Sequence, residues 1–127
     1  MPQDTTEPLY TRDIDLDPIT RRRIAIVGYG NHGRSHALCL RDSGAGQIRI
    51  ALRAGSPSRA KAEADGFQVV SVAEAAGWAD VIALLAADEA HRQIWTEAIL
   101  PNRKPGQALI VCHGFSVHYG LIDAPAD

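Results

Sequence analysis

The 127-residue chain has few cysteines, few aromatic residues and no strong excess of either charge. Its two cysteines, Cys39 and Cys112, stand apart in apolar stretches without the paired spacing of a disulfide framework or a zinc-binding motif. We therefore expect buried thiols in a reducing compartment. The 13 basic and 15 acidic residues give a net charge of −2, which argues against nucleic acid or an anionic membrane as a partner.

Long apolar runs are also missing. No stretch approaches the ~20 residues that a membrane span needs. The first ten residues, MPQDTTEPLY, are polar and acidic, unlike a secretory signal. We therefore expect a cytoplasmic protein that contacts no membrane.

The chain does contain a regular alternation of apolar runs and amphipathic segments. Residues 1–21 are polar, contain three prolines and are expected to form an arm, with one domain over 22–127. Strands are expected at 23–27, 47–53, 67–70, 80–86 and 107–112, and a loop-like tail from 113. Helices are expected at 32–43, 56–66, 72–79 and 88–100, the third of them capped by Ser71. This alternation predicts an α/β fold with a doubly wound parallel sheet. Ligands of such sheets bind beyond the carboxyl ends of the strands.

The segment GYGNHG at 28–33 lies between the first expected strand and the first expected helix. In the pattern Gly28-x-Gly30-x-x-Gly33, the first glycine permits the turn and the second lets a pyrophosphate approach the backbone. The third lets the helix pack on the strand. Such turns also occur without nucleotides, but this setting favours nucleotide binding. His32 and His36 are four residues apart, yet a metal site would need a third ligand that the sequence does not identify.

The second strand ends at Arg53 and is followed by Ser56 and Ser58. Proteins that bind NAD usually place an acidic residue there for the ribose 2′-hydroxyl, whereas a cation with hydroxyls suits a 2′-phosphate. The alternative is that Arg53 is solvated and the serines only cap the next helix. We interpret the pattern as favouring NADP(H).

His113 follows the fifth strand and should face the same crevice as the nicotinamide. It suits a hydrogen bond to a substrate oxygen or a role in a proton relay. The alternative is an imidazole bonded to a local carbonyl. His91 and His118 are interpreted as less informative, the first on the polar face of a helix and the second in a loop.

Taken together, the segments RIAIVGYGNHGRSHALCLRDSG, ALRAGSPSRAKAEADGFQVVSVAEAAGWADVI and LPNRKPGQALIVCHGFSVHYG resemble the N-terminal Rossmann-like domain of ketol-acid reductoisomerase, or acetohydroxyacid isomeroreductase. The resemblance runs from about residue 9 to the end of the chain. It implies an NADPH- and Mg²⁺-dependent conversion of 2-acetolactate to 2,3-dihydroxyisovalerate in isoleucine and valine biosynthesis. It also implies a catalytic His113 and a cofactor site made of Gly28, Tyr29, Gly30, Asn31, His32, Gly33, Arg53, Ser56, Ser58 and Asp88.

The sequence departs from that family in several places. The usual GYGSQGHAHA is GYGNHGRSHA here, and the proline before the DE pair is Ala87. Arg34 either adds a cation for the phosphates or faces solvent.

The metal-binding carboxylates of the family lie in a helical, knotted C-terminal domain that this sequence does not include, nor does it include the last strands of the nucleotide domain. We therefore expect no metal site here, no catalysis by this chain alone, and one uncovered sheet edge. That edge is suited to a separate C-terminal-domain polypeptide or to self-association. The alternatives are a non-enzymatic relative that binds a nucleotide or a protein partner and, less favoured, a reductase that uses His113 on another carbonyl.

Overall fold

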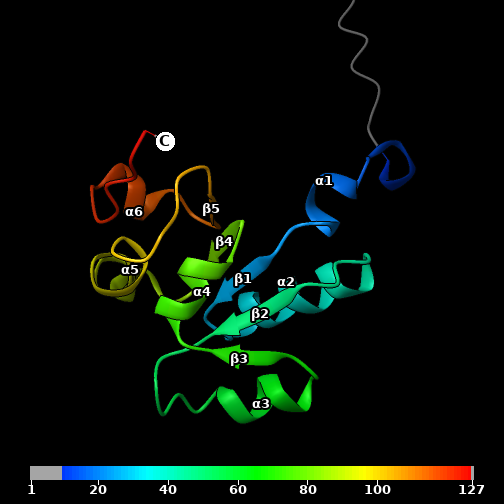
Figure 1. Ribbon diagram of the computed structural model, residues 1–127, viewed down its shortest axis with the longest axis horizontal. Coiled ribbons are helices and arrows are strands. Elements are labelled where there is room, and N and C mark those ends of the chain that lie inside the picture. The colour runs from blue at the N-terminus through cyan, green and yellow to red at the C-terminus, as the bar shows by residue number, and fades with distance from the viewer. Residues whose placement is uncertain (1–9, 127) are drawn as a thin grey trace, which may run out of the picture.

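Within residues 10–126, which the computed structural model describes apart from the side chain of Thr11, five parallel strands form one sheet (Figure 1). The strands are β1 (Ile24–Val27), β2 (Ile48–Ala51), β3 (Gln68–Val70), β4 (Val81–Leu84) and β5 (Ala108–Val111), in the order β3-β2-β1-β4-β5. This order confirms the predicted doubly wound sheet. Its direction of winding reverses between β1 and β4, which is where such sheets bind ligands.

Helices follow the strands along the chain. They are η1 (Thr11–Asp13), α1 (Asp17–Thr20), α2 (Asn31–Asp42), α3 (Arg59–Ala64), α4 (Val72–Trp78), α5 (Asp88–Ile94), the π-helix η2 (Trp95–Ile99) and α6 (Phe115–His118). Within the described residues, every helix is too short or too polar to span a bilayer.

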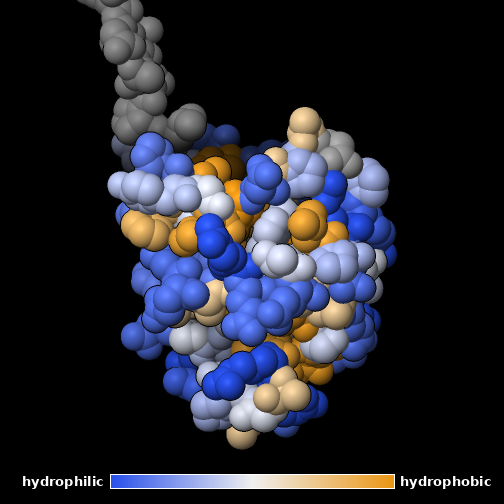
Figure 2. Space-filling view, turned by 90° about the vertical axis from the view of Figure 1, so that its left-hand side faces the viewer, coloured by the Kyte–Doolittle hydropathy of each residue, from blue (hydrophilic) through white to orange (hydrophobic). Residues whose placement is uncertain are grey.

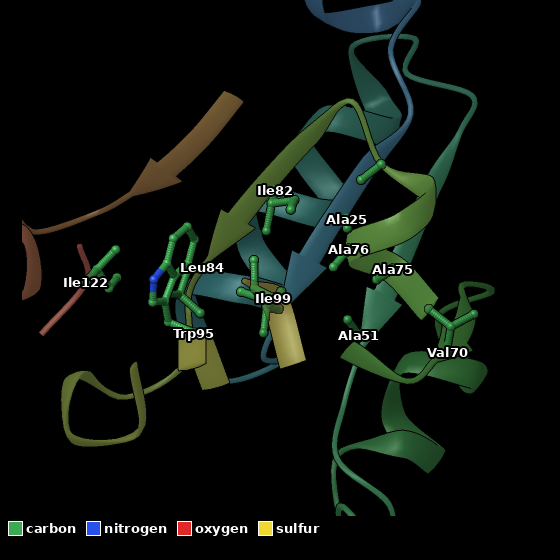
Figure 3. Packing of buried hydrophobic residues seen from close by; sticks show 12 residues of the cluster. Ala25, Ala51, Val70, Ala75, Ala76, Ile82, Leu84, Trp95, Ile99 and Ile122 are labelled. Carbon is green, nitrogen blue, oxygen red and sulfur yellow. The ribbon is translucent and has the colours of Figure 1, made fainter. Parts of the chain in front are cut away.

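The sheet is covered on both faces because alternate strand residues point in opposite directions. On β1, Ala25 and Val27 join a buried cluster with α4, α5 and η2, whereas Ile24 and Ile26 join a second cluster with α2 and α3. All four residues of β1 are buried, as predicted from its continuous apolar run. Figure 3 shows the first cluster, in which the Trp95 ring lies beside Leu84.

Local signals in the sequence explain where several helices begin and end. The hydroxyl oxygen of Ser71 accepts a hydrogen bond of 3.1 Å from the amide of Glu74, which confirms the predicted start of α4. Gly44 and Gly66 follow α2 and α3 with φ angles of +101° and +91°, a backbone conformation that favours glycine and ends the helix.

Within the predicted arm, residues 11–13 and 17–20 are helical, while Pro2 and Pro8 lie outside the described residues. Two sequence-based expectations were wrong. The tail contains α6. Cys39 and Cys112 are free thiols as expected, but both are exposed instead of buried. An apolar neighbourhood in sequence did not predict burial here, because Cys39 lies on the outer face of α2 and Cys112 lies just beyond the edge strand.

The edge strand β5 is the least covered part of the sheet. Its residues alternate between exposed and half-buried, and Ile110 is 43% exposed. The neighbouring segment of α6 adds Phe115, Val117 and Tyr119 as exposed large hydrophobic residues. Figure 2 shows the side on which β5 and α6 lie, with hydrophobic patches among hydrophilic residues. The expected uncovered edge is therefore present.

Candidate functional site

Two glycines of the turn after β1 are required by packing. Gly28 has a φ of +98°, and a Cβ placed on it would lie 2.9 Å from the backbone nitrogen of Ala86. A Cβ on Gly33 would collide with the carbonyl oxygen of Gly28. The turn therefore lets α2 lie close to β1, and β1 close to the end of β4, as the glycine pattern predicts.

The middle glycine differs from its neighbours. Gly30 precedes α2 with φ −77° and ψ −160°, and a Cβ placed on it would have no atom within 4 Å. No side chain caps α2 at this residue. The first amides of a helix have no partner within the helix and favour an anion. The open space at Gly30 therefore fits a phosphate group.

A cleft of about 730 Å³ connects the glycine turn to the end of β2. Gly28 and Tyr29 line it together with Arg53, Ser56 and Ser58. The structure thus brings together the residues that the sequence suggested for a 2′-phosphate.

The loop after β2 leaves its polar groups available to that cleft. Arg53 is exposed, and among the described residues its guanidinium has no hydrogen bond or ion pair. Ser56 Oγ accepts a hydrogen bond of 3.3 Å from the amide of Ser58, whose own hydroxyl does not cap α3. The alternative of serines that only cap the helix therefore does not account for Ser58.

A second cleft, of about 420 Å³, lies on the other side of the glycine turn. Gly30, Asn31 and His32 line it from the start of α2, Asp88 lines it from the start of α5, and His113 lines it from the segment after β5. Ala86 and Ala87 line both clefts, so the two are neighbours. Every predicted site residue except Gly33, which is buried beneath the turn, lines one cleft or the other.

His113 is exposed, and its Nδ1 accepts a hydrogen bond of 3.1 Å from the amide of Phe115. The partner is thus a local amide and not the local carbonyl of the alternative interpretation. Because Nδ1 is the acceptor, the neutral ring carries its proton on Nε2. His113 is therefore suited to donate a hydrogen bond from Nε2.

His91 is buried, which the interpretation of a polar helix face did not predict. Its Nδ1 lies 2.7 Å from the hydroxyl of Ser116, and its Nε2 lies 2.8 Å from the carbonyl oxygen of Ala86. Through these two bonds His91 connects Ala86, which lines both clefts, to Ser116 of α6. The spacing of His91, Trp95 and Ile99 at i, i+4 and i+8 is the signal that places it on the buried face.

The Arg34 side chain is half-buried and paired with a carboxylate, an arrangement that neither alternative above describes. Its Nε and Nη2 donate hydrogen bonds of 2.8 and 3.2 Å to the carboxylate of Asp65. The hydroxyl of Tyr29 donates a third, of 2.6 Å. The side chains of Tyr29 and Arg34 therefore hold the glycine turn and α2 to the residue that follows α3.

These bonds shift two titrations. The hydrogen bonds from Arg34 and then Tyr29 lower the pKa of Asp65 to about 2. Burial and the hydrogen bond to Asp65 raise the pKa of Tyr29 to about 12. The Tyr29 phenol therefore stays neutral and is engaged within the fold, which leaves its backbone to face the cleft.

The donor set of the described residues does not fit Mg²⁺. This ion prefers octahedral oxygen ligands. Between residues 10 and 126, one group of three converging donor side chains is found, and it contains two imidazoles and a thiol instead of carboxylates.

The chain is similar in sequence and in structure to known proteins. The family model described as "Acetohydroxy acid isomeroreductase, NADPH-binding domain" matches residues 18–127. A ketol-acid reductoisomerase (NADP(+)) of Saccharopolyspora erythraea is 52% identical over 122 residues, which cover 96% of this chain and 36% of that protein.

Solved structures extend the comparison. The structure of an NADH-preferring ketol-acid reductoisomerase from an uncultured archaeon has a TM-score of 0.87 and 36% identity, over 95% of this chain and 38% of that one. A semialdehyde dehydrogenase NAD-binding protein from Cupriavidus necator, 21% identical with a TM-score of 0.70 over 83% of this chain and 38% of its own, shares the fold. The chain thus spans little more than a third of the reductoisomerases that it matches.

Proposed function

Because the chain belongs to the acetohydroxy acid isomeroreductase family through its NADPH-binding domain, we propose that it is the dinucleotide-binding part of a ketol-acid reductoisomerase. In this proposal the adenosine end of NADP(H) occupies the larger cleft and the nicotinamide end occupies the smaller one. The observation that carries it is the glycine turn, whose Gly28 lines the larger cleft and whose open Gly30, at the start of α2, lines the smaller one.

The pyrophosphate would lie against that helix start. Gly30 leaves the space, and the first amides of α2 supply donors and the positive end of the helix dipole. Asn31 and His32 border this space from the first turn of the helix. Gly28 and Gly33 act beneath it, since each removes a side chain that would push two backbone segments apart.

Recognition of the 2′-phosphate is assigned to Arg53, Ser56 and Ser58. The guanidinium of Arg53, which has no partner within the part of the chain that the structure describes, offers a charge-assisted hydrogen bond, and the two serines offer hydroxyls along the same cleft. Family membership alone leaves the preference open, because one similar reductoisomerase prefers NADH. The loop after β2 supports NADPH because it presents a cation and no carboxylate.

At the nicotinamide end, bound NADPH would supply a hydride. The chain's own residues would position the reacting groups there. His113 presents Nε2–H to donate a hydrogen bond to a substrate oxygen, and Asp88 lies in the same cleft. His91 acts indirectly, because its bonds to Ser116 and Ala86 hold the wall shared by the clefts.

Reduction of a ketol acid by this family is expected to need metal-binding carboxylates, and we derive no step through Mg²⁺ because the described donor set does not fit it. We propose that the rest of the enzyme covers the exposed edge around β5 and α6. Size-exclusion chromatography of the chain and of its Ile110→Lys variant tests this point. A stable dimer of the chain that Ile110→Lys dissociates would instead favour self-association.

The cofactor proposal is tested by titrating the purified chain with NADPH and with NADH, following the nucleotide fluorescence at one fixed ionic strength. A charge-assisted hydrogen bond contributes ~1.5–3 kcal/mol. Since Arg53 is exposed, we expect the lower end, a preference for NADPH of about tenfold. Equal binding of the two nucleotides, or binding of neither, would contradict the assignment.

Matched variants separate this site from general charge effects. Arg53→Gln should weaken NADPH about tenfold and leave NADH nearly unchanged. Arg59→Gln removes the same charge from a side chain that is paired with Glu63 and does not line the cleft, so it should change neither affinity. Turnover of 2-acetolactate with Mg²⁺ by the 127-residue chain would show that no further part of the enzyme is needed.

A further inference from the structure

Three side chains that bind metals well converge beside the phosphate turn. His32 and His36 come from the first two turns of α2, and Cys112 comes from the end of β5. One donor atom from each lies within 4.8 Å of the other two, and all three residues are exposed. Cys112 is the third ligand that the sequence alone does not reveal, because it follows His36 by 76 positions.

The geometry is close to that of a four-coordinate metal site. The Sγ of Cys112 lies 3.8 Å from Nε2 of His36. With Zn–S and Zn–N bonds of ~2.3 and ~2.05 Å, tetrahedral coordination places sulfur and nitrogen about 3.6 Å apart. The two histidines share one face of the helix, since residues four apart are neighbours on its surface. Small side-chain rotations therefore suffice to bring the three donors onto one ion.

The donor types point to a particular class of metal. A thiolate with two imidazoles suits Zn²⁺ and other divalent transition ions, whereas Mg²⁺ and Ca²⁺ require oxygen ligands. The thiol of Cys112 is free, and among the described residues its contact with His36 is its sole hydrogen-bonding contact. These groups are therefore available, and other interactions do not explain why they meet.

We propose that His32, His36 and Cys112 form a binding site for a divalent transition metal, best suited to Zn²⁺. His32 and Cys112 also line the smaller cleft, so the fourth coordination position is open to solvent or to a ligand in that cleft. The site goes beyond the proposed nucleotide function, because His36 and Cys112 are not assigned to the cofactor; His32 alone is shared, since it also borders the space proposed for the pyrophosphate. Metal binding can accordingly be measured without any nucleotide.

Titration of the reduced, metal-free chain with Co²⁺ tests the proposal by absorption spectroscopy. We expect a thiolate-to-cobalt charge-transfer band together with the intense visible bands of a four-coordinate ion. Both should saturate at one ion per chain, and Zn²⁺ should displace the cobalt. Absence of the charge-transfer band at saturating Co²⁺ would overturn the proposal.

Variants assign the ligands. Cys112→Ser should remove the charge-transfer band. His32→Gln and His36→Gln should each weaken Co²⁺ binding at least about 100-fold, because loss of a residue that only orients a metal ligand already costs about 10–100-fold. Two matched controls should bind Co²⁺ as the parent chain does: Cys39→Ser, on α2 with the two histidines, and His118→Gln, on α6. A band that survives Cys112→Ser, or that disappears in Cys39→Ser, would refute this ligand set. Unchanged circular dichroism spectra confirm that these exposed substitutions leave the fold intact.

Discussion

We expect the substitution Gly30→Ala to remove most dinucleotide binding while the chain stays about as stable as the parent. At this residue the backbone already has a conformation open to alanine, and the added methyl group would have no protein atom within 4 Å. Alanine has less conformational freedom than glycine in the unfolded chain, which stabilises the folded protein by ~0.4–1 kcal/mol. Loss of a favoured cap residue costs ~0.5–1 kcal/mol, so the two terms nearly cancel.

The same methyl group at Gly33 should have the opposite effect. It would overlap the carbonyl oxygen of Gly28, which cannot rotate away as a side chain would. Overpacking costs ~1–3 kcal/mol, and a backbone neighbour favours the upper end. At ~3–5 °C per kcal/mol for a chain of this length, we expect the melting temperature to fall by about 10 °C.

Two measurements on the same samples check this contrast. Thermal unfolding by circular dichroism should give Gly30→Ala a melting temperature within ~3 °C of the parent. NADPH titration should show at least ~10-fold weaker binding, because the methyl group occupies the space assigned to the pyrophosphate. If Gly30→Ala binds NADPH as the parent does, the phosphate is not at this turn. If Gly33→Ala melts with the parent, the close approach of α2 to β1 is not what fixes that glycine.

Three further predictions concern stability. The pKa values of Asp65 and Asp80 are lowered from 3.8 to about 2, chiefly by hydrogen bonds from arginines, so their contribution is full above about pH 4 and is lost as the pH falls through about 2. Asp65→Asn and Asp80→Asn should each flatten the loss of urea stability over that range, and an unchanged slope in both would contradict the assignment. His91→Phe should cost about 2–3 kcal/mol in urea unfolding, because the buried hydroxyl of Ser116 and the half-buried carbonyl of Ala86 lose their hydrogen bonds; a cost below ~0.5 kcal/mol would mean that these bonds contribute little. Trp95→Ala should cost about 3–5 kcal/mol, and a cost near 1 kcal/mol would mean that the cluster in Figure 3 closes over the cavity.

The sheet and the glycine turn were predictable because each depends on local chemistry. A continuous apolar run such as β1 is compatible with burial on both faces, and alternation with helices leaves parallel pairing as the remaining arrangement. Gly28 and Gly33 are required because neighbouring backbone atoms leave no space for a Cβ at either position. The cleft at Arg53 follows from the same topology, since parallel strands bring their carboxyl ends to one edge.

The environment of a side chain was predictable only where the sequence carries a periodic pattern. The buried state of His91 is contained in its spacing to Trp95 and Ile99, but its bond to Ser116 depends on where α6 returns to the fold. Arg34 is a sharper case. Its position at the start of α2 suggests a phosphate ligand, yet Asp65 lies near enough to capture it. The choice between a ligand and an internal carboxylate depends on a tertiary distance that no local pattern encodes.

The cluster of His32, His36 and Cys112 combines both kinds of information. The helix repeat places the two histidines on one face of α2. It does not predict a third metal ligand that comes from another element of the fold. Cys112 arrives only because β5 pairs with β4 in register and ends above α2, so strand order, register and the exposed state of the thiol must all be known. The exposure that contradicted the expected buried cysteine is thus the property that makes the site possible. A thiol packed in the core would be unable to reach imidazoles on the rim of a cleft.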